Sequence, residues 1–299
     1  MRISKHRMRR IAPAALFLCV AAALYAVTVW AAPPEPAGRP KATEKSADSA
    51  ARTKQRDENF QEMEKRAVGT KIRPAGQEKK RDAELIARPL FHYTDEPRRI
   101  VDATLWGWLA EGRLLAVCKI EKYDHPQPER IWLYCLGSLA TGLIEAEWPD
   151  GRRWSAKKPG IEMKPIAAAP APAAGKPARL RQMKEISNRF QATITDTANG
   201  SSQEMRLLPR PIFRYEKPSG DLLDGAVFGL TTNGTNPDAL LIVELLKPDG
   251  AAEQWQFAVA GMTAGALSVK FDDKEVWTKP YVGNTGSYET WTWFFGKNE

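Results

Sequence analysis

Two pairs of segments in this chain repeat each other without a gap, and this repetition constrains the fold more than any other feature. Residues 84–108 align with residues 206–230, and residues 132–154 align with residues 255–277, in the same order along the chain. Arg-Pro, Phe, Tyr, Asp, Gly and Trp recur at matched positions, and apolar residues face apolar residues between them. Two collinear blocks of this kind are typical of an internal duplication.

The rest of the organisation follows from composition. Pro/Ala-rich stretches behave as extended linkers, and a segment with little to bury cannot offset the entropy of ordering. The chain is therefore expected to contain a signal peptide or N-terminal anchor (1–31), a disordered spacer (32–57), repeat module 1 (58–163), a Pro/Ala linker (164–178), repeat module 2 (179–280) and an aromatic C-terminal extension (281–299).

Each module has the pattern of one helix followed by short strands. In the second module Leu180, Met183, Ile186 and Phe190 recur at helical spacing after a proline. Strict alternation over residues 267–271 and at the matched positions 144–148 predicts a strand with one buried face. The predicted fold class is α+β and mostly β: two tandem repeats, each a leading helix plus an antiparallel meander of six or seven strands. The sequence leaves open whether the two sheets pack on each other.

The N-terminus has the pattern of an export signal. Five basic residues lie within residues 1–10, and residues 11–30 carry no charge. Two alternatives remain open: cleavage after Ala31, or retention as a membrane anchor, because an uncharged run of this length also spans a bilayer. The predicted location is periplasmic or secreted, or anchored by an N-terminal transmembrane helix.

The net charge argues against nucleic-acid binding. The whole chain carries a formal charge of +8, but residues 32–82 hold 13 Lys and Arg against 9 Asp and Glu, and the leader holds five more basic residues. The remainder is close to neutral, whereas phosphate-backbone binding needs positive charge on the folded surface. We expect no nucleic-acid partner, and contact with a membrane only through the N-terminal segment.

The duplication singles out a few polar residues. Asp102 matches Asp224, and Arg88 matches Arg210. The aspartates are candidates for acid–base chemistry, although a turn-forming Asp that binds its own backbone is the simpler interpretation. The arginines are candidates for an anion site, although each precedes a proline that marks the start of a strand. His92, which matches Arg214, has no companion at metal-ligand spacing, so the sequence predicts no metal and no cofactor.

Cys118 and Cys135 lie on consecutive predicted strands. If the connecting loop closes symmetrically, the two residues lie opposite each other, and export permits a disulfide. The alternative is two buried thiols, because cross-strand disulfides are often strained.

Four aromatic residues lie beyond the second repeat: Tyr288, Trp291, Trp293 and Phe295. They are consistent with an extra strand that docks on the second module. The alternative is a binding edge that contacts a partner.

The stretches RLLPRPIFRY, LLDGAVFGLTTNGTNPDALLIVEL and RLRQMKEISNRFQATI resemble a family of planctomycete secreted proteins of unknown function with an internal duplication. That resemblance implies export and a two-part build. The order of helix, RFQATI, RPIFRYEKP and LLDGAVF also resembles the opening of periplasmic lipoprotein-carrier proteins, in which a half-barrel holds an acyl chain. The later strand order departs from that pattern.

The predicted function is that of an exported or membrane-tethered, non-enzymatic binding or structural protein, with an envelope protein or a glycan as partner. Two alternatives remain: a periplasmic carrier of lipid or another apolar ligand, and a hydrolase with an unrecognised site.

Overall fold

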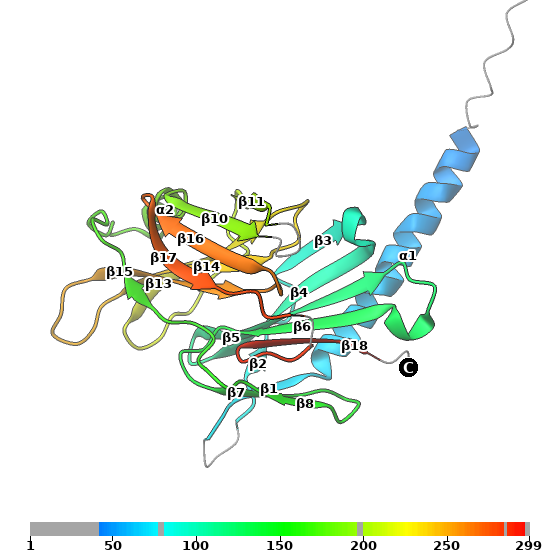
Figure 1. Ribbon diagram of the computed structural model, residues 1–299, viewed down its shortest axis with the longest axis horizontal. Helices are drawn as coiled ribbons and strands as arrows, with labels where there is room; N and C mark the ends of the chain where they lie inside the picture. Colours follow the sequence, from blue (N-terminus) through cyan, green and yellow to red (C-terminus); the bar gives the residue numbers. More distant parts are fainter. Residues whose placement is uncertain (1–41, 77–80, 196–199, 284–285, 297–299) are drawn as a thin grey trace, which may run out of the picture. The chain divides into compact units, whose positions relative to one another are not determined.

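The computed structural model describes residues 42–76, 81–195, 200–283 and 286–296, and residues 49–299 form one compact unit (Figure 1). The first half of the chain contains α1 (Ala42–Val68), β1 (Lys71–Pro74), β2 (Glu84–Leu85), β3 (Phe91–Asp95), η1 (Glu96–Arg98), β4 (Ile100–Ala110), β5 (Arg113–Tyr123), η2 (Pro128–Arg130), β6 (Trp132–Ser138), β7 (Ile144–Glu147), β8 (Arg153–Ser155) and β9 (Lys164–Pro165). The second half contains α2 (Lys176–Ser187), β10 (Phe190–Thr195), β11 (Ser202–Leu207), β12 (Phe213–Arg214), β13 (Leu222–Thr231), β14 (Ala239–Leu246), β15 (Gln254–Gly261), β16 (Ala266–Phe271), β17 (Lys274–Lys279) and β18 (Trp291–Gly296).

The strands form three antiparallel sheets. One sheet has the order β18-β6-β5-β4-β2, with β3 also paired to β4. A second has the order β17-β16-β10-β11-β13-β14-β15-β9, with β12 paired to β13, and a small third sheet has the order β1-β7-β8. The prediction of a mostly β, α+β fold with antiparallel sheets is confirmed.

Burial on both faces explains why β5 and β14 lie in the interior of their sheets. β5 and β14 are apolar on both faces and lie in the middle of their sheets, as LLAVCKI and ALLIVELL predict. By contrast, β7 and β16 bury alternate residues, so that Ile144 and Leu267 are buried while the residue after each is partly exposed. The predicted alternation is confirmed in both strands.

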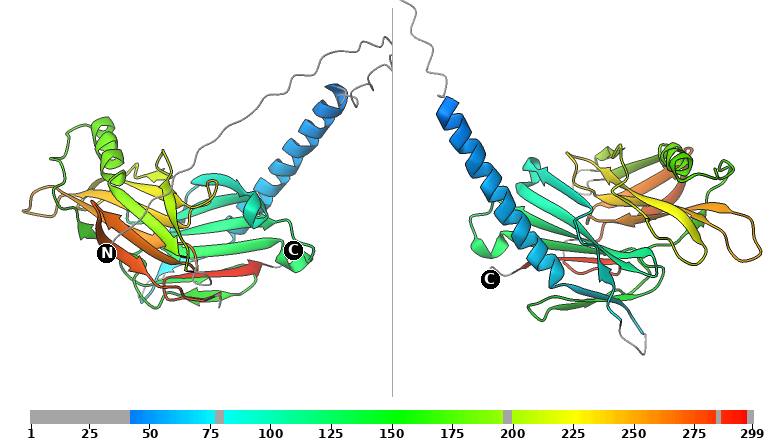
Figure 2. Two further views of the ribbon diagram at one scale, coloured as in Figure 1. Left: turned by 45° about the horizontal axis from the view of Figure 1, so that its top comes forward. Right: turned by 180° about the vertical axis from the view of Figure 1, so that it is seen from behind.

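Three apolar clusters lie between the layers of residues 49–299. The face of β4–β6 that bears Trp106 packs against Met63 and Ala67 of α1, and the opposite face, with Leu105, packs against Ile242 of β14. The remaining face of β13–β15 packs beneath α2 through Met183. The two large sheets therefore pack on each other, and each is covered on its outer face by a helix (Figure 2).

Helix α1 begins earlier than the sequence pattern predicts. Residues 32–57 were expected to be a spacer without structure, but the helix starts at Ala42; residues 32–41 lie outside the described residues. The reason is that residues 42–68 contain neither Pro nor Gly and are rich in Ala, Glu, Lys, Gln and Arg, which favour helix even where nothing is buried. An ion pair of 3.8 Å between Lys54 and Glu58, one turn apart, adds to this preference.

The aromatic C-terminal extension docks on a different half than expected. Its strand β18 pairs with β6, with Trp293 opposite Cys135, and not with a strand of the second half. Conversely, β9 leaves the first half and pairs with β15, with Lys164 opposite Phe257. Each half therefore supplies the edge strand of the other half's sheet, which is a long-range pairing that local sequence patterns do not encode.

No helix in the described part of the chain is long and apolar enough to cross a membrane. The predicted leader, residues 1–31, lies outside the described residues.

Candidate functional site

The matched aspartates Asp102 and Asp224 are buried in the sheets, and each binds a helix. Asp102, 1% exposed on β4, accepts hydrogen bonds from Asn59 Nδ2 of α1 at 3.0 Å and lies 2.5 Å from His92 Nε2. Burial alone would raise the pKa of Asp102, but the contacts with His92 and Asn59 outweigh it and lower the pKa below its ordinary value.

Asp224, fully buried on β13, is held in the same way by stronger donors. Arg179 of α2 binds its Oδ2 at 2.9 Å, and Arg214 binds the same oxygen at 2.8 Å. Burial again opposes ionisation, yet the two guanidinium groups lower the pKa of this carboxyl. The backbone N–H of Gly225 also donates to Asp224, so the predicted contact with the local backbone exists, but the residue lies within a strand and not in a turn.

These geometries assign the aspartates a structural task. Both carboxylates are buried and fix a helix to a sheet, and they lie on different sheets. The matched arginines Arg88 and Arg210 are both exposed. The anion site that these arginines suggest stays a prediction.

The cysteines do not face each other. In the β5–β6 ladder Cys118 lies opposite Leu136, and Cys135 lies opposite Lys119, so the two side chains point to opposite faces of the sheet. Both thiols are free and buried. The expectation of symmetric loop closure is therefore wrong by one residue, and the alternative of two buried thiols describes the structure. Burial raises the pKa of Cys135 to about 12.

The predicted binding aromatics mostly face the core between the sheets. Tyr288 and Trp291 are buried there and stack with ring centroids 4.3 Å apart. Trp293 and Phe295 pack at the edge of the same cluster. Their role as ligand contacts stays a prediction, but their positions serve the docking of β18.

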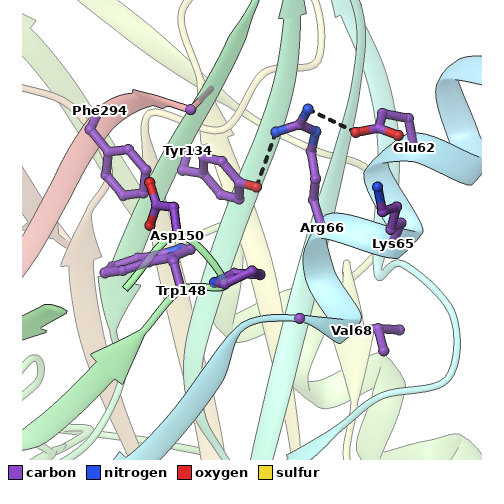
Figure 3. Close-up of a pocket in the computed structure, with 11 residues that line it drawn as sticks. Glu62, Lys65, Arg66, Val68, Tyr134, Trp148, Asp150 and Phe294 are labelled. Atoms are coloured by element: carbon purple, nitrogen blue, oxygen red, sulfur yellow. Dashed lines mark hydrogen bonds and ion pairs between the residues drawn. The ribbon is translucent and has the colours of Figure 1, made fainter. Parts of the chain in front are cut away.

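The strongest candidate site lies on the other face of β18, at the end of α1. A cavity of about 280 Å³ is lined by Glu62, Lys65, Arg66, Val68, Gly69, Tyr134, Trp148, Pro149, Asp150, Phe294 and Gly296. Four segments far apart in the sequence supply these residues: the last turns of α1, strand β6, the β7–β8 turn and strand β18. Figure 3 shows Arg66 between Glu62 and the hydroxyl group of Tyr134, with Trp148 and Asp150 on the opposite side of the cavity.

Arg66 is the buried charged group of the cavity, and several neighbours hold it in place. Arg66 is buried, forms an ion pair of 2.7 Å with Glu62 and donates to Tyr134 Oη at 3.3 Å. Its guanidinium group also lies 4.9 Å from the centre of the Trp132 ring. Burial raises the pKa of Tyr134 to about 12, against the lowering effect of Arg66. Tyr134 is therefore neutral at physiological pH and keeps its hydroxyl proton.

Three aromatic rings form the wall of the cavity. Phe294 stacks on Tyr134 at 5.0 Å and meets Trp148 edge-on at 4.8 Å. The indole nitrogen of Trp148 is buried and has no hydrogen-bond partner among the residues that the structure describes. A buried N–H without an acceptor costs free energy, so this donor marks a place for an acceptor atom.

A second hollow, of about 610 Å³, lies beside the β4–β5 turn. Its charged residues, among them Arg81, Glu111 and Lys217, are all exposed. The first cavity, by contrast, contains the buried side chains of Arg66, Tyr134 and Trp148, so the first cavity is the better defined site.

Within the described ranges, no group of three or more His, Cys, Asp and Glu residues is placed to hold a metal ion. No family model, no curated protein and no solved structure matches this chain. The function is therefore argued from the geometry of the site.

The site residues predicted from the sequence do not include Phe294 or Arg66. The position of Phe294 could have been predicted, because successive residues of a strand point to opposite faces. If Trp293 and Phe295 face one core, Phe294 faces the other side of the sheet. The position of Arg66 could not, because a basic residue in the last turn of a helix is common.

Proposed function

We propose that this chain is an exported or membrane-tethered, non-enzymatic binding protein that is built from two homologous modules and contacts its partner through the cavity at the end of α1. One observation carries the proposal: four distant segments converge on a cavity whose aromatic and charged side chains are held in place by one another. Ligand sites typically combine an apolar wall with a few fixed polar groups in this way.

The proposal of two homologous modules draws support from strand pairing. β1, β7 and β8 pair in the same order as β10, β16 and β17, and β4-β5-β6 pair in the same order as β13-β14-β15. Trp106 lies opposite Cys118 in the first ladder, and the matched Phe228 lies opposite Leu241 in the second. The two ladders therefore have the same register.

Contacts between buried polar side chains also recur at matched positions of the two halves. Tyr93 donates to Glu121 at 2.6 Å. In the second half, burial and the neighbouring Glu244 both raise the pKa of the matched Tyr215. The pairs Asn59–Asp102 and Arg179–Asp224 likewise join a helix to a sheet at matched positions.

The proposal of a non-enzymatic protein rests on the contacts of the two carboxylates that were candidates for acid–base chemistry. Asp102 and Asp224 are the repeat-matched acids, and each binds one helix side chain and one side chain of a neighbouring strand. The hydrolase alternative therefore has no supporting observation at these residues. The carrier alternative requires a hollow beneath a helix, whereas the space between α2 and its sheet holds large rings such as Phe190, Trp255 and Phe257.

Export, the anchor and the partner are further parts of this proposal. The leader supports export, and only residues 32–41 lie between the predicted cleavage site after Ala31 and the start of helix α1. The proposed partner is a component of the cell envelope, either a protein or a glycan.

Site-specific crosslinking in exporting cells tests the proposal. A photoreactive benzophenone side chain would replace Val68, which is 67% exposed at the rim of the cavity, or Val101, which is 48% exposed elsewhere. We expect a discrete product from position 68 and none from position 101. Equal products from both positions, or none from position 68, would overturn the cavity as the contact site.

A further inference from the structure

The loop between β13 and β14 carries an Asn-Gly pair that lies apart from the cavity described above. Asn233 and Gly234 are both exposed at the tip of this loop. Asn-Gly is a common turn sequence, because both residues tolerate the backbone angles of tight turns. It is also the dipeptide in which an asparagine side chain reacts most readily with the following backbone nitrogen, since glycine has no Cβ to hinder the approach.

The structure leaves both reacting groups available. Among the described residues, neither the side-chain amide of Asn233 nor the backbone N–H of Gly234 forms a hydrogen bond. Gly234 has a φ of 53°, in the left-handed region that glycine adopts without steric cost. A Cβ at this position would meet the carbonyl oxygen of Thr94 at 3.6 Å, which is an ordinary contact. The tip of the loop is therefore not tightly enclosed.

The base of the loop, in contrast, is closed by hydrogen bonds. Asp238 Oδ2 accepts from the backbone N–H of Thr232 at 3.1 Å and from its hydroxyl group at 2.7 Å. Arg98 of the first half binds both residues, through Nη1 to Asp238 Oδ1 at 2.9 Å and through Nη2 to Thr232 Oγ1 at 3.1 Å. The main chain between these two residues therefore has a fixed start and a fixed end.

Within this span the loop places a buried amide between the two halves. Asn236 is 2% exposed, its Oδ1 accepts from Lys119 Nζ at 2.8 Å, and its Nδ2 donates to Asp95 Oδ2 at 3.1 Å. Lys119 on β5 and Asp95 at the end of β3 are themselves buried. Because the base of the loop is closed, the position of the Asn236 amide depends on the length of the main chain at the tip.

We propose that Asn233 is a site of spontaneous self-modification, at which the chain acquires an isoaspartate and loosens the contact between its two large sheets. The backbone nitrogen of Gly234 attacks Cγ of Asn233 and loses its proton. The bond from Cγ to the side-chain nitrogen breaks, ammonia leaves, and a cyclic imide remains. Water then opens the imide: attack at Cγ gives aspartate, and attack at the backbone carbonyl carbon gives isoaspartate. Overall, water is consumed and ammonia is released, with no oxidation or reduction.

The two products act differently on the loop. Aspartate leaves the main chain unchanged and adds a charge at an exposed position. Isoaspartate brings Cβ into the main chain and so lengthens it by one atom, within a loop whose base is closed. The extra atom displaces the amide of Asn236, so that Lys119 and Asp95 lose a buried hydrogen-bond partner, and the loss of such a partner is unfavourable.

Ageing of the purified full chain at pH 8, followed by peptide mass spectrometry, tests the reaction. Asn236 is the matched control in the same loop, because the nitrogen of Pro237 carries no hydrogen and cannot form the imide. We expect aspartate and isoaspartate to accumulate at Asn233 about tenfold faster than at Asn236. Asn233→Gln should stop the reaction at this position, because the longer side chain would have to close a larger ring. Asn199, which precedes Gly200, lies outside the described residues, and its peptide is scored separately.

Urea denaturation of the aged protein tests the structural consequence. Asn233→Asp supplies the carboxylate without the extra atom and should keep the urea midpoint of the fresh protein. The isoaspartate form, separated by ion exchange, should unfold at a lower urea concentration and show faster amide hydrogen exchange in β3 and β5, where Asp95 and Lys119 lie. Equal rates at Asn233 and Asn236 would overturn the modification site. Isoaspartate at position 233 with an unchanged urea midpoint would overturn the loosening of the sheet contact.

Discussion

Asn59 on helix α1 donates a hydrogen bond of 3.0 Å to the buried carboxylate of Asp102 on strand β4. Arg179 makes the matching contact from α2 to Asp224 at 2.9 Å. Each leading helix is thus bound to its own sheet through one buried carboxylate. This contact fixes the position of the helix along the apolar face of that sheet.

Replacement of Asp224 by Asn should destabilise the protein strongly. The change leaves Arg179 and Arg214 buried or half-buried without a counter-charge, and breaking a buried pair typically costs about 3–5 kcal/mol in the free energy of unfolding. Urea denaturation followed by tryptophan fluorescence measures this. Asp272→Asn is the matched control, because its ion pair with Arg189 is exposed, and it should change the stability little. Similar losses in both variants would contradict the anchoring role of Asp224.

Acid should unfold this protein by protonating the buried aspartates. The pKa values of Asp102, Asp224 and Asp238 are lowered from 3.8 by their partners, in spite of burial. The folded state therefore binds fewer protons than the unfolded state near these values. Their stabilisation is fully present above the unfolded pKa of about 4 and is lost as the pH falls through the folded pKa. Unfolding free energies between pH 6 and pH 2.5 should decline below about pH 4; a flat profile would refute this.

Both thiols should be unreactive in the folded protein. Cys118 and Cys135 are buried, and burial raises the pKa of each well above its ordinary value. Iodoacetamide at pH 8 should label neither residue under native conditions and both in urea, as intact mass reports. The mass should also be the same with and without reductant, and a gain of two hydrogens on reduction would show that a disulfide forms.

Removal of residues 289–299 should damage the first sheet and spare the second. The deletion takes away β18, which pairs with β6, whereas the neighbours of β14 remain. Amide hydrogen exchange should therefore speed up in β6 and stay slow in β14. Faster exchange confined to the second half would restore the original expectation that the tail docks there.

Much of the fold was predictable because local patterns encode it. The alternation at Ile144 and Leu267, the apolar runs of β5 and β14 and the helical spacing before Ser187 each determine a local element. The predicted helix wrongly included Phe190, which is the first residue of strand β10.

The site was less predictable because it depends on pairings across the chain. Phe294 reaches Trp148 only because β18 crosses to β6, and nothing in the tail itself encodes that choice. The duplication pointed correctly to Asp102 and Asp224 as special positions, but a single sequence does not distinguish a catalytic carboxylate from one that fixes a helix to a sheet.

The exchange of edge strands also sets the order of events during synthesis. β18 occupies residues 291–296, so the first sheet receives this edge strand only after β10–β17 have been synthesised. Domains usually fold as they emerge, N-terminal part first, but here the earlier sheet stays incomplete until the strands of the later sheet have been made. The export proposed above would benefit from this delay, because a translocation pore accepts a chain that is still unfolded.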